Sequence, residues 1–390
     1  VLNAARLSQR RKGLGLAPVG QSTAGNSVPS AEAHQSKGIR RKQMAVVSYK
    51  CPNCDGELVF NPRTQKYKCE YCTSAFSQEE LSQMQPGRQE GRQESANLKG
   101  AGDEKGNVYS CPSCGAQIVT DDTTAASFCY YCHNPVVLSG RVSGEFMPDK
   151  IIPFAIDKRQ ATEKFLEYVQ HKKFVPRAFF CKSQIEKISG VYFPYWMVDM
   201  DLEGSMEAEG KHIRVWRSGD TEYTETKLYQ VERAGDIHLE DLAKNALKKA
   251  NSKLSAGVLP YDMAKAQEFH MGYLSGFLAE KRDMEQGELE TEVRAEAKEY
   301  GEKLLKGTIH GYTALSVKGC RLNRQRENWE YLLLPVWTVT YKGRDGKFYY
   351  YSMNGQNGKV YGELPIDLKK VWILSGIVSV TVFLLGLIGG

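Results

Sequence analysis

Histidine is scarce in this chain: it has seven among 390 residues, and none belongs to an H-E-x-x-H or Ser/His/Asp arrangement. The sequence also has no dinucleotide-binding glycine fingerprint and no kinase motif set. The stretch from Gly15 to Ser22 resembles a phosphate-binding loop, but Gln21 replaces the lysine that contacts phosphates. These absences leave catalysis without positive support, so we expect a protein that is not an enzyme.

A basic surface is missing from most of the chain as well. The net charge of +6 arises in residues 1–43, which hold eight Lys/Arg and one acid, whereas the rest holds 44 basic and 45 acidic groups. The second cysteine frame described below contains no Lys or Arg between Cys111 and Cys132. Nucleic-acid binding is therefore the less favoured alternative, because phosphate contacts need clustered cations.

Residues 1–43 have few large apolar side chains and are rich in Gly, Ser, Gln and Ala, which predicts a disordered basic tail. No apolar run follows Arg10-Arg11-Lys12, so the segment is not a signal peptide. Met44 stands just before the first cysteine frame. Two interpretations remain open: translation starts at Met44, or the tail is genuine and contacts anionic lipid or nucleic acid.

Eight of the ten cysteines form two frames of the same spacing, C-x2-C, fourteen residues, C-x2-C. The first frame is Cys51, Cys54, Cys69 and Cys72, and the second is Cys111, Cys114, Cys129 and Cys132. Without an export signal this spacing predicts two tetrahedral zinc sites rather than disulfides, with rubredoxin-type iron as the alternative metal. Four thiolates leave no open coordination position, so both Zn²⁺ ions are expected to be structural.

The frames define two expected zinc ribbons, residues 48–76 and residues 108–138. The segment between them, residues 77–107, is polar and rich in Gly and Gln, apart from a short helical turn expected near Ser77–Met84. We therefore expect a flexible linker with two independent ribbons at its ends.

Residues 150–366 have the pattern of a globular α+β domain. A strand is expected at 151–156, followed by a helix that Asp157 caps; a second helix is expected from Glu288 to Lys306. A strand containing Pro-x-Trp follows each helix, at 194–196 and 335–337. This order predicts an internal duplication, with chance coincidence of the two strings as the alternative. A final hairpin with two Asn-Gly pairs is expected within residues 347–364.

The last twenty residues, 371–390, carry no charge and are mostly Val, Ile and Leu. That length matches the thickness of a bilayer core, and Lys369 and Lys370 precede it, so the pattern predicts a transmembrane helix with the preceding domains in the cytoplasm. The fold class expected from the whole sequence is therefore multidomain: two small β zinc ribbons, an α+β domain with an internal duplication, and a C-terminal transmembrane helix.

Three further features receive structural interpretations. Asp199, Asp201 and Glu203 alternate along one strand and are expected to be a solvated face rather than a cation site. His270 and Cys181 are expected to be packing residues.

The chain resembles a bacterial family of membrane-anchored, TFIIB-type zinc-ribbon proteins, some of which are labelled primosomal or helicase proteins. The stretches that carry the resemblance are the paired cysteine frames, GVYFPYWMVD, LPYDMAKAQEFHMGYLSGFLAEKRD, LLLPVWTVTY and MNGQNGKVYGELPID. The resemblance implies a single-pass protein of the bacterial cell membrane that works in envelope stress, with cytoplasmic and membrane partners that include a band-7-like protein.

The sequence therefore predicts a non-enzymatic, membrane-anchored adaptor that recruits protein partners through its ribbons. Its alternative is a zinc-ribbon protein that binds nucleic acid in replication or transcription at the membrane.

Overall fold

The computed structural model describes residues 4–8, 46–47, 49–84, 107–110, 117–120, 123–128, 135–138, 146–180, 187–248, 252–343 and 346–389. The chain is mostly β-sheet, with 45% strand. The strands are β1 (Ala4–Ser8), β2 (Val46–Val47), β3 (Leu58–Asn61), β4 (Lys66–Cys69), β5 (Ala75–Phe76), β6 (Asn107–Ser110), β7 (Gln117–Thr120), β8 (Thr124–Phe128), β9 (Pro135–Leu138), β10 (Lys150–Ile151), β11 (Ser189–Ser218), β12 (Thr221–Asn245), β13 (Gln267–Glu268), β14 (Leu278–Glu280), β15 (Ala314–Lys342), β16 (Phe348–Asn354) and β17 (Val360–Gly362).

The described helices are α1 (Gln78–Met84), α2 (Lys158–Gln170), α4 (Ser252–Gly257), α5 (Gln286–Gly307) and α6 (Leu368–Gly389), with short 3-10 helices that include η5 (Met271–Leu274). The helical turn expected near Ser77–Met84 is confirmed as α1. The expected cap is confirmed too: the Asp157 side chain accepts the backbone N–H of Gln160 in a capping box at the start of α2.

The expected fold class is wrong in two respects. The large domain is dominated by one 12-stranded sheet rather than by an α+β arrangement, because β11, β12 and β15 are each 25 to 30 residues long. The hydrophobic pattern of the sequence indicated only the buried parts of these strands. Their outer parts are exposed on both faces, so apolar and polar residues do not alternate there.

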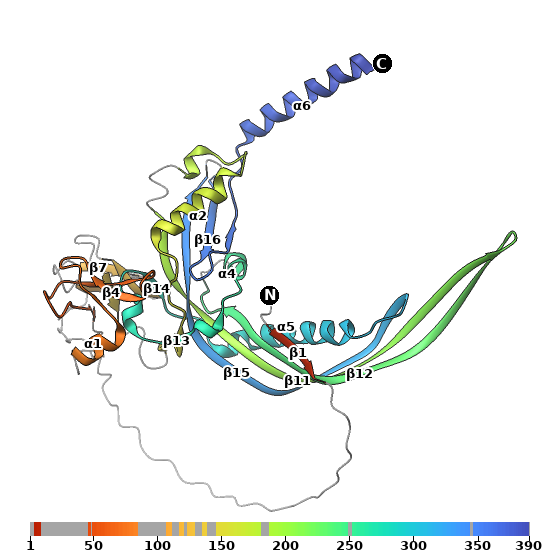
Figure 1. Ribbon diagram of the computed structural model, residues 1–390, viewed down its shortest axis with the longest axis horizontal. Coiled ribbons are helices and arrows are strands. Elements are labelled where there is room, and N and C mark those ends of the chain that lie inside the picture. The colour runs from red at the N-terminus through yellow and green to blue at the C-terminus, as the bar shows by residue number, and fades with distance from the viewer. Residues whose placement is uncertain are drawn as a thin grey trace, which may run out of the picture.

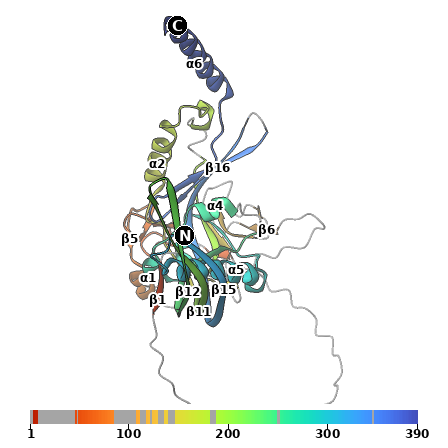
Figure 2. The ribbon, with the colours of Figure 1, turned by 90° about the vertical axis from the view of Figure 1, so that its right-hand side faces the viewer.

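The expected membrane span is also wrong. Among the described residues, no helix combines the length and the apolar character that crossing a bilayer requires. The apolar run is helical as α6, and Lys369 and Lys370 lie inside its first turn. The single-pass placement at the bacterial cell membrane is corrected by the same finding. Figures 1 and 2 show α6 projecting from the end of the body.

The centre of the sheet has the order β13-β10-β15-β11-β14-β8. The two strands that contain Pro-x-Trp, β11 and β15, are antiparallel neighbours, with Phe193 opposite Leu334. The short strand β10 runs parallel to β15, and β14 runs parallel to β11. The short strand β10 precedes α2 but pairs with β15, which follows α5. In the same way, β14 precedes α5 but pairs with β11, which follows α2.

Equivalent contacts occur on the two sides of this centre. The indole Nε1 of Trp337 donates to the Ile156 carbonyl, 2.9 Å away, just before α2. The indole Nε1 of Trp196 donates to the Met284 carbonyl, 3.1 Å away, just before α5. A capping box starts each helix. The order of short strand, capped helix and long strand therefore occurs twice in the large sheet.

The core of the outer half of the sheet lies beneath α5. Its apolar stripe, Leu289, Val293, Ala297 and Leu305, is buried, and most of it packs on side chains of β11 and β12 such as Met200 and Ile237. Gly204 and Gly301 sit where the helix approaches the strands, and a Cβ on either would come within 3 Å of Leu322. Beyond this helix, β11 and β12 continue as a curved arm (Figure 1).

Five residues of the N-terminal segment differ from the expectation of disorder. Residues Ala4–Ser8 form β1, which pairs antiparallel with β12 from Ser8 opposite Asp236 to Ala4 opposite Glu240. The rest of residues 1–43 lies outside the described part of the chain.

Candidate metal centre

The first cysteine frame folds into two matching turns. In one, the Cys51 N–H donates to the Gly56 carbonyl at 2.7 Å, and in the other the Cys69 N–H donates to the Ser74 carbonyl at 2.9 Å. The residue after the second cysteine of each pair has a left-handed backbone, with φ of 59° at Asp55 and 60° at Thr73. Asp tolerates this conformation through local hydrogen bonding, and each turn folds both of its sulfurs to one side.

The four sulfurs of this frame converge. The Sγ atoms of Cys51, Cys54, Cys69 and Cys72 all lie within 4.8 Å of one another. Two pairs, Cys51 with Cys72 and Cys54 with Cys69, are 3.5 Å apart. A tetrahedral zinc ion with Zn–S bonds of about 2.3 Å separates its sulfurs by roughly 3.8 Å. The predicted clustering is thus confirmed, and the donor set fits a tetrahedral, thiophilic metal ion.

Hydrogen bonds distinguish one of the thiols. The Ser74 side chain and backbone lower the pKa of Cys72 to about 6. The Cys72 thiol donates to the Ser74 hydroxyl, 3.3 Å away, and the Asn53 amide donates to the same hydroxyl at 3.0 Å. When Cys72 is ionised, the Ser74 hydroxyl can donate to the thiolate instead. Cys72 therefore favours the thiolate form that binds metal.

The other sulfurs oppose ionisation while they lack a counter-charge. Burial raises the pKa of Cys51. The Gly56 N–H lowers the pKa of Cys54, but the neighbouring sulfurs outweigh it and raise that pKa to about 12. Four thiolates in this space repel one another, so a divalent cation would release protons from them as it binds. All four positions of a tetrahedral ion would be filled, which leaves no site for a substrate.

The ribbon formed by residues 49–76 is packed against the large sheet, which differs from the independent ribbon expected from the sequence. The Phe60 N–H donates to the Ser275 carbonyl at 3.1 Å, and the Ser275 hydroxyl donates to the Leu58 carbonyl at 2.6 Å. The Phe60 ring lies 5.1 Å from Tyr273 and 5.5 Å from Tyr67, edge to face in both cases. Ser275 is 2% exposed, so this edge of β3 is sealed from water.

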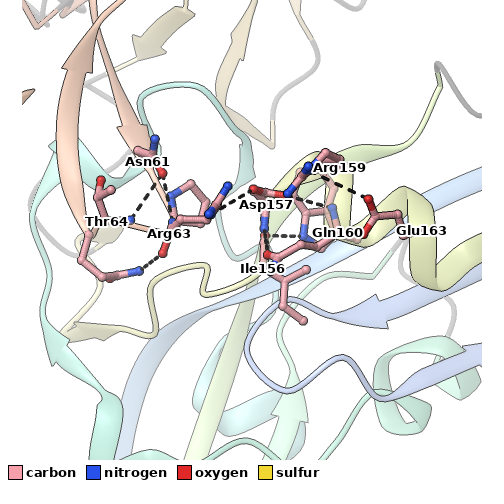
Figure 3. Close-up of polar contacts among 11 residues, drawn as sticks. Asn61, Arg63, Thr64, Ile156, Asp157, Arg159, Gln160 and Glu163 are labelled. Atoms are coloured by element: carbon pink, nitrogen blue, oxygen red, sulfur yellow. Dashed lines mark hydrogen bonds and ion pairs between the residues drawn. The ribbon is translucent and has the colours of Figure 1, made fainter. Parts of the chain in front are cut away.

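A second contact joins the ribbon hairpin to the start of α2. Figure 3 shows the β3–β4 turn, where Asn61 holds the backbone of Arg63 and Thr64, beside the helix cap. The Arg63 guanidinium lies 3.9 Å from the Asp157 carboxylate, and both are partly exposed, so this pair contributes little to stability. The Gln65 amide donates to the Phe154 carbonyl at 2.8 Å. The metal centre is thereby held in a fixed orientation on the body.

The second cysteine frame, Cys111, Cys114, Cys129 and Cys132, lies outside the described residues, so a second metal site stays a prediction. The strands around it are described: β6 pairs with β7, and β8 pairs with β9, both antiparallel. β8 also pairs with β14, so this part of the chain joins the large sheet. The predicted flexible linker is described only as far as Met84.

The other residues singled out in the sequence have ordinary partners. The Asp199 carboxylate accepts the Asp241 N–H, Asp201 lies 2.8 Å from His238, and Glu203 accepts from the Gln325 amide, so this acidic strand face forms no converging cation site. His270 caps η5 by accepting the Gly272 N–H at Nδ1, 3.1 Å away. Cys320 is partly buried against the core beneath α5, and Cys181 lies outside the described residues.

Sequence analysis missed the arm, which we define as residues 211–228 of β11 and β12. The pairing of β11 with β15 ends at Lys211 opposite Ala314, so the arm is a two-stranded ribbon among the described residues (Figure 1). It ends in a tight turn with Gly219 at a φ of 62°. The alternation of β-branched and aromatic residues could have predicted these strands. Charged residues interrupt both faces, however, and they obscured that alternation.

Comparison with known proteins shows the family of the chain. It is 30% identical over 346 residues to the Uncharacterized protein YdjG of Bacillus subtilis (strain 168), which covers 88% of this chain and 97% of that protein. No known family profile matches the chain. No solved structure matches it either. The chain belongs to the family of this Bacillus subtilis protein.

Proposed function

We propose that this protein is a non-enzymatic adaptor that binds protein partners through its β arm, and that the first cysteine frame holds one structural Zn²⁺ ion. The observation that carries the proposal is the arm itself: a paired ribbon that leaves the body and exposes apolar side chains to solvent. An isolated two-stranded ribbon is only marginally stable in water, and exposed apolar patches mark interaction sites.

One face of the arm is β-branched. The register places Ile213 opposite Thr226 and Val215 opposite Thr224, with Leu228 at the base of the same face. Val215 is 54% exposed and Leu228 is 62% exposed. The charges of this face lie at its two ends: Lys211 is opposite Leu228 at the base, and Arg217 and Glu222 pair with each other across the strands at 3.2 Å at the tip.

The opposite face is aromatic. Trp216 and Tyr223 stack with their ring centroids 5.6 Å apart and their planes 14° apart. The Arg214 guanidinium lies 5.5 Å from the Trp216 ring. Trp, Tyr and Arg are the side chains that contribute most at the centres of protein–protein interfaces. The arm therefore offers a partner two different faces on one ribbon.

Charge favours a protein partner over nucleic acid. Within the arm, the cations are Lys211, Arg214, Arg217 and Lys227, and the anions are Asp220, Glu222 and Glu225. Lys227 lies 3.5 Å from Glu225, and Lys211 lies 3.7 Å from Glu209. Neighbouring strands of a sheet lie about 4.8 Å apart, so each cation has an anion nearby and the ribbon presents no basic stripe for phosphates. A protein surface with both signs of charge complements it better.

Zinc is favoured by the donor set. Four cysteine sulfurs in a tetrahedral cluster suit a soft ion without geometric preference, and zinc in such closed sites contributes folding energy rather than chemistry. In this role the ion fixes the ribbon that docks on Ser275 and Asp157, and so stabilises one end of the body.

Site-specific photo-crosslinking in the cells that produce the protein tests the proposal. A photoreactive amino acid would replace Val215 on one arm face or Tyr223 on the other, and Lys298 on the exposed side of α5 would be the matched control. We expect discrete protein adducts from an arm position, and their loss when Trp216→Ala and Leu228→Ser are combined with the crosslinker.

Adducts that form equally at Lys298, or adducts absent from both arm positions, would contradict the adaptor role of the arm. Adducts to nucleic acid that nuclease treatment removes would replace the proposal by nucleic-acid binding. Metal analysis of the purified chain, before and after Cys54→Ser with Cys69→Ser, tests the zinc ion separately, because the arm is distant from the ribbon (Figure 1).

A further inference from the structure

A shallow cavity, open to solvent over most of its extent, lies where the loop after α2 meets the segment before α6. Its volume is about 380 Å³, and it is lined by His171, Lys172, Lys173, Phe174, Val175, Leu364, Pro365 and Ile366. Small-molecule sites in proteins begin at about 300 Å³. The cavity is thus large enough for one small ligand.

Two hydrogen bonds to backbone carbonyls join the two segments that form the walls of the cavity. The Asp367 N–H donates to the Phe174 carbonyl at 2.7 Å, and the Lys370 ammonium donates to the Val175 carbonyl at 2.8 Å. Val175 and Pro365 are buried, whereas Phe174 and Leu364 are half-buried. The floor is therefore a pre-formed apolar surface joined across about 190 residues of sequence.

The rim has the opposite character. His171, Lys172 and Lys173 are consecutive and exposed, and within the described part of the chain no ion pair joins either lysine to an acid. The Lys172 ammonium lies 5.1 Å from the Tyr168 ring. Cations do favour the C-terminal end of a helix such as α2, which accounts for one of them. Helix-end stabilisation does not account for their position at the mouth of an apolar cavity.

We propose that this cavity binds a single-chain amphiphile with an anionic head, such as a free fatty-acid carboxylate. The acyl chain would occupy the floor formed by Phe174, Val175 and Leu364, and the carboxylate would lie between Lys172 and Lys173. Charge-assisted hydrogen bonds to a carboxylate are stronger than neutral ones, which selects an anionic head over a neutral or cationic one. The site shares no residue with the arm or the metal centre, so the inference does not rest on the adaptor role.

Calorimetric titration of the full chain with dodecanoate, kept below its micelle concentration, tests the inference. We expect saturable binding of one dodecanoate per chain, weaker binding of dodecanol and no binding of dodecyltrimethylammonium. Reversing the rim charges with Lys172→Glu and Lys173→Glu should weaken dodecanoate binding about tenfold or more, as expected for loss of charged hydrogen bonds.

A second variant, Leu364→Trp, fills the floor and should weaken dodecanoate and dodecanol alike. The matched control is Lys66→Glu with Lys68→Glu, two exposed lysines on the ribbon strand β4, which should bind as the unmodified chain does. Equal affinity for dodecanoate and dodecanol, or binding that neither cavity variant changes, would overturn the proposal. Binding to anionic phosphatidylglycerol vesicles without binding to monomeric dodecanoate would overturn it as well, because it would assign the basic rim to a lipid surface.

Discussion

Replacing Phe60 by alanine is expected to release the metal ribbon from the body without unfolding it. The Phe60 ring is 2% exposed and lies between Tyr67 of the ribbon and Tyr273 of the body. Truncation of a buried Phe costs about 3–5 kcal/mol. Because one of its two aromatic neighbours lies across the interface, roughly half of that cost, at least about 1.5 kcal/mol, falls on docking. The docking equilibrium should therefore weaken about tenfold or more.

Hydrogen exchange measured by mass spectrometry reports this directly. The amide at position 60 donates to the Ser275 carbonyl across the interface, so undocking exposes it, together with the segment around η5. We expect peptides covering residues 56–61 and 269–278 to exchange about tenfold faster in Phe60→Ala at unchanged metal content. Tyr71→Ala is the control, because Tyr71 belongs to the same ribbon and is 72% exposed.

Unchanged exchange in both peptides, with metal retained, would refute the reasoning that Phe60 docks the ribbon. Faster exchange accompanied by loss of metal would refute the division of the Phe60 packing energy between the ribbon and its interface with the body. The ribbon would then unfold instead of undocking.

Three further outcomes follow from the geometry. Burial lowers the pKa of His270, whose neutral Nδ1 accepts the Gly272 N–H. The pKa in the unfolded chain is about 6.5, so this stabilisation is present above that pH and is lost as the pH falls below it. The melting temperatures at pH 7.5 and pH 5.5 should therefore differ less in His270→Asn than in the unmodified chain. Trp196→Phe and Trp337→Phe each orphan a carbonyl and should each lower the free energy of unfolding by about 1–3 kcal/mol in denaturant titrations, and a much larger effect of one would show that the two bonds are not equivalent. Gly190→Ala should destabilise by about 1–3 kcal/mol, because its Cβ would lie 2.7 Å from Phe277 in the core, whereas Gly287→Ala has open space and should be neutral or stabilising.

Local signals in the sequence predicted local features well. The spacing of Cys51 to Cys72 predicted a converging sulfur cluster, Asp157 predicted a helix start, and the Asn-Gly pairs predicted the β16–β17 hairpin. Each of these depends on residues close together in the chain, whose hydrogen bonds and turns are determined by their own side chains.

Features that depend on distant partners could not be obtained in this way. The sequence predicted an independent ribbon, but Leu58 and Ser275 are 217 positions apart and nothing local to either indicates that they meet. The length of β12 was missed because its outer part is charged on both faces, so burial produces no period of two. The run after Lys370 predicted a membrane span from its composition, whereas no helix among the described residues is long and apolar enough to cross a membrane.

The exchange of strands at the centre of the sheet has a consequence for how the chain can be divided. β10 is completed by β15, and β14 is completed by β11, so neither half contains all the neighbours of its own strands. A polypeptide cut between Asn245 and Leu278 should therefore yield two fragments whose central strands lack neighbours, and the complete sheet should form only when the fragments are mixed. The topology is that of two interlocked halves joined by a covalent tether, and co-expression of the two fragments should restore the sheet.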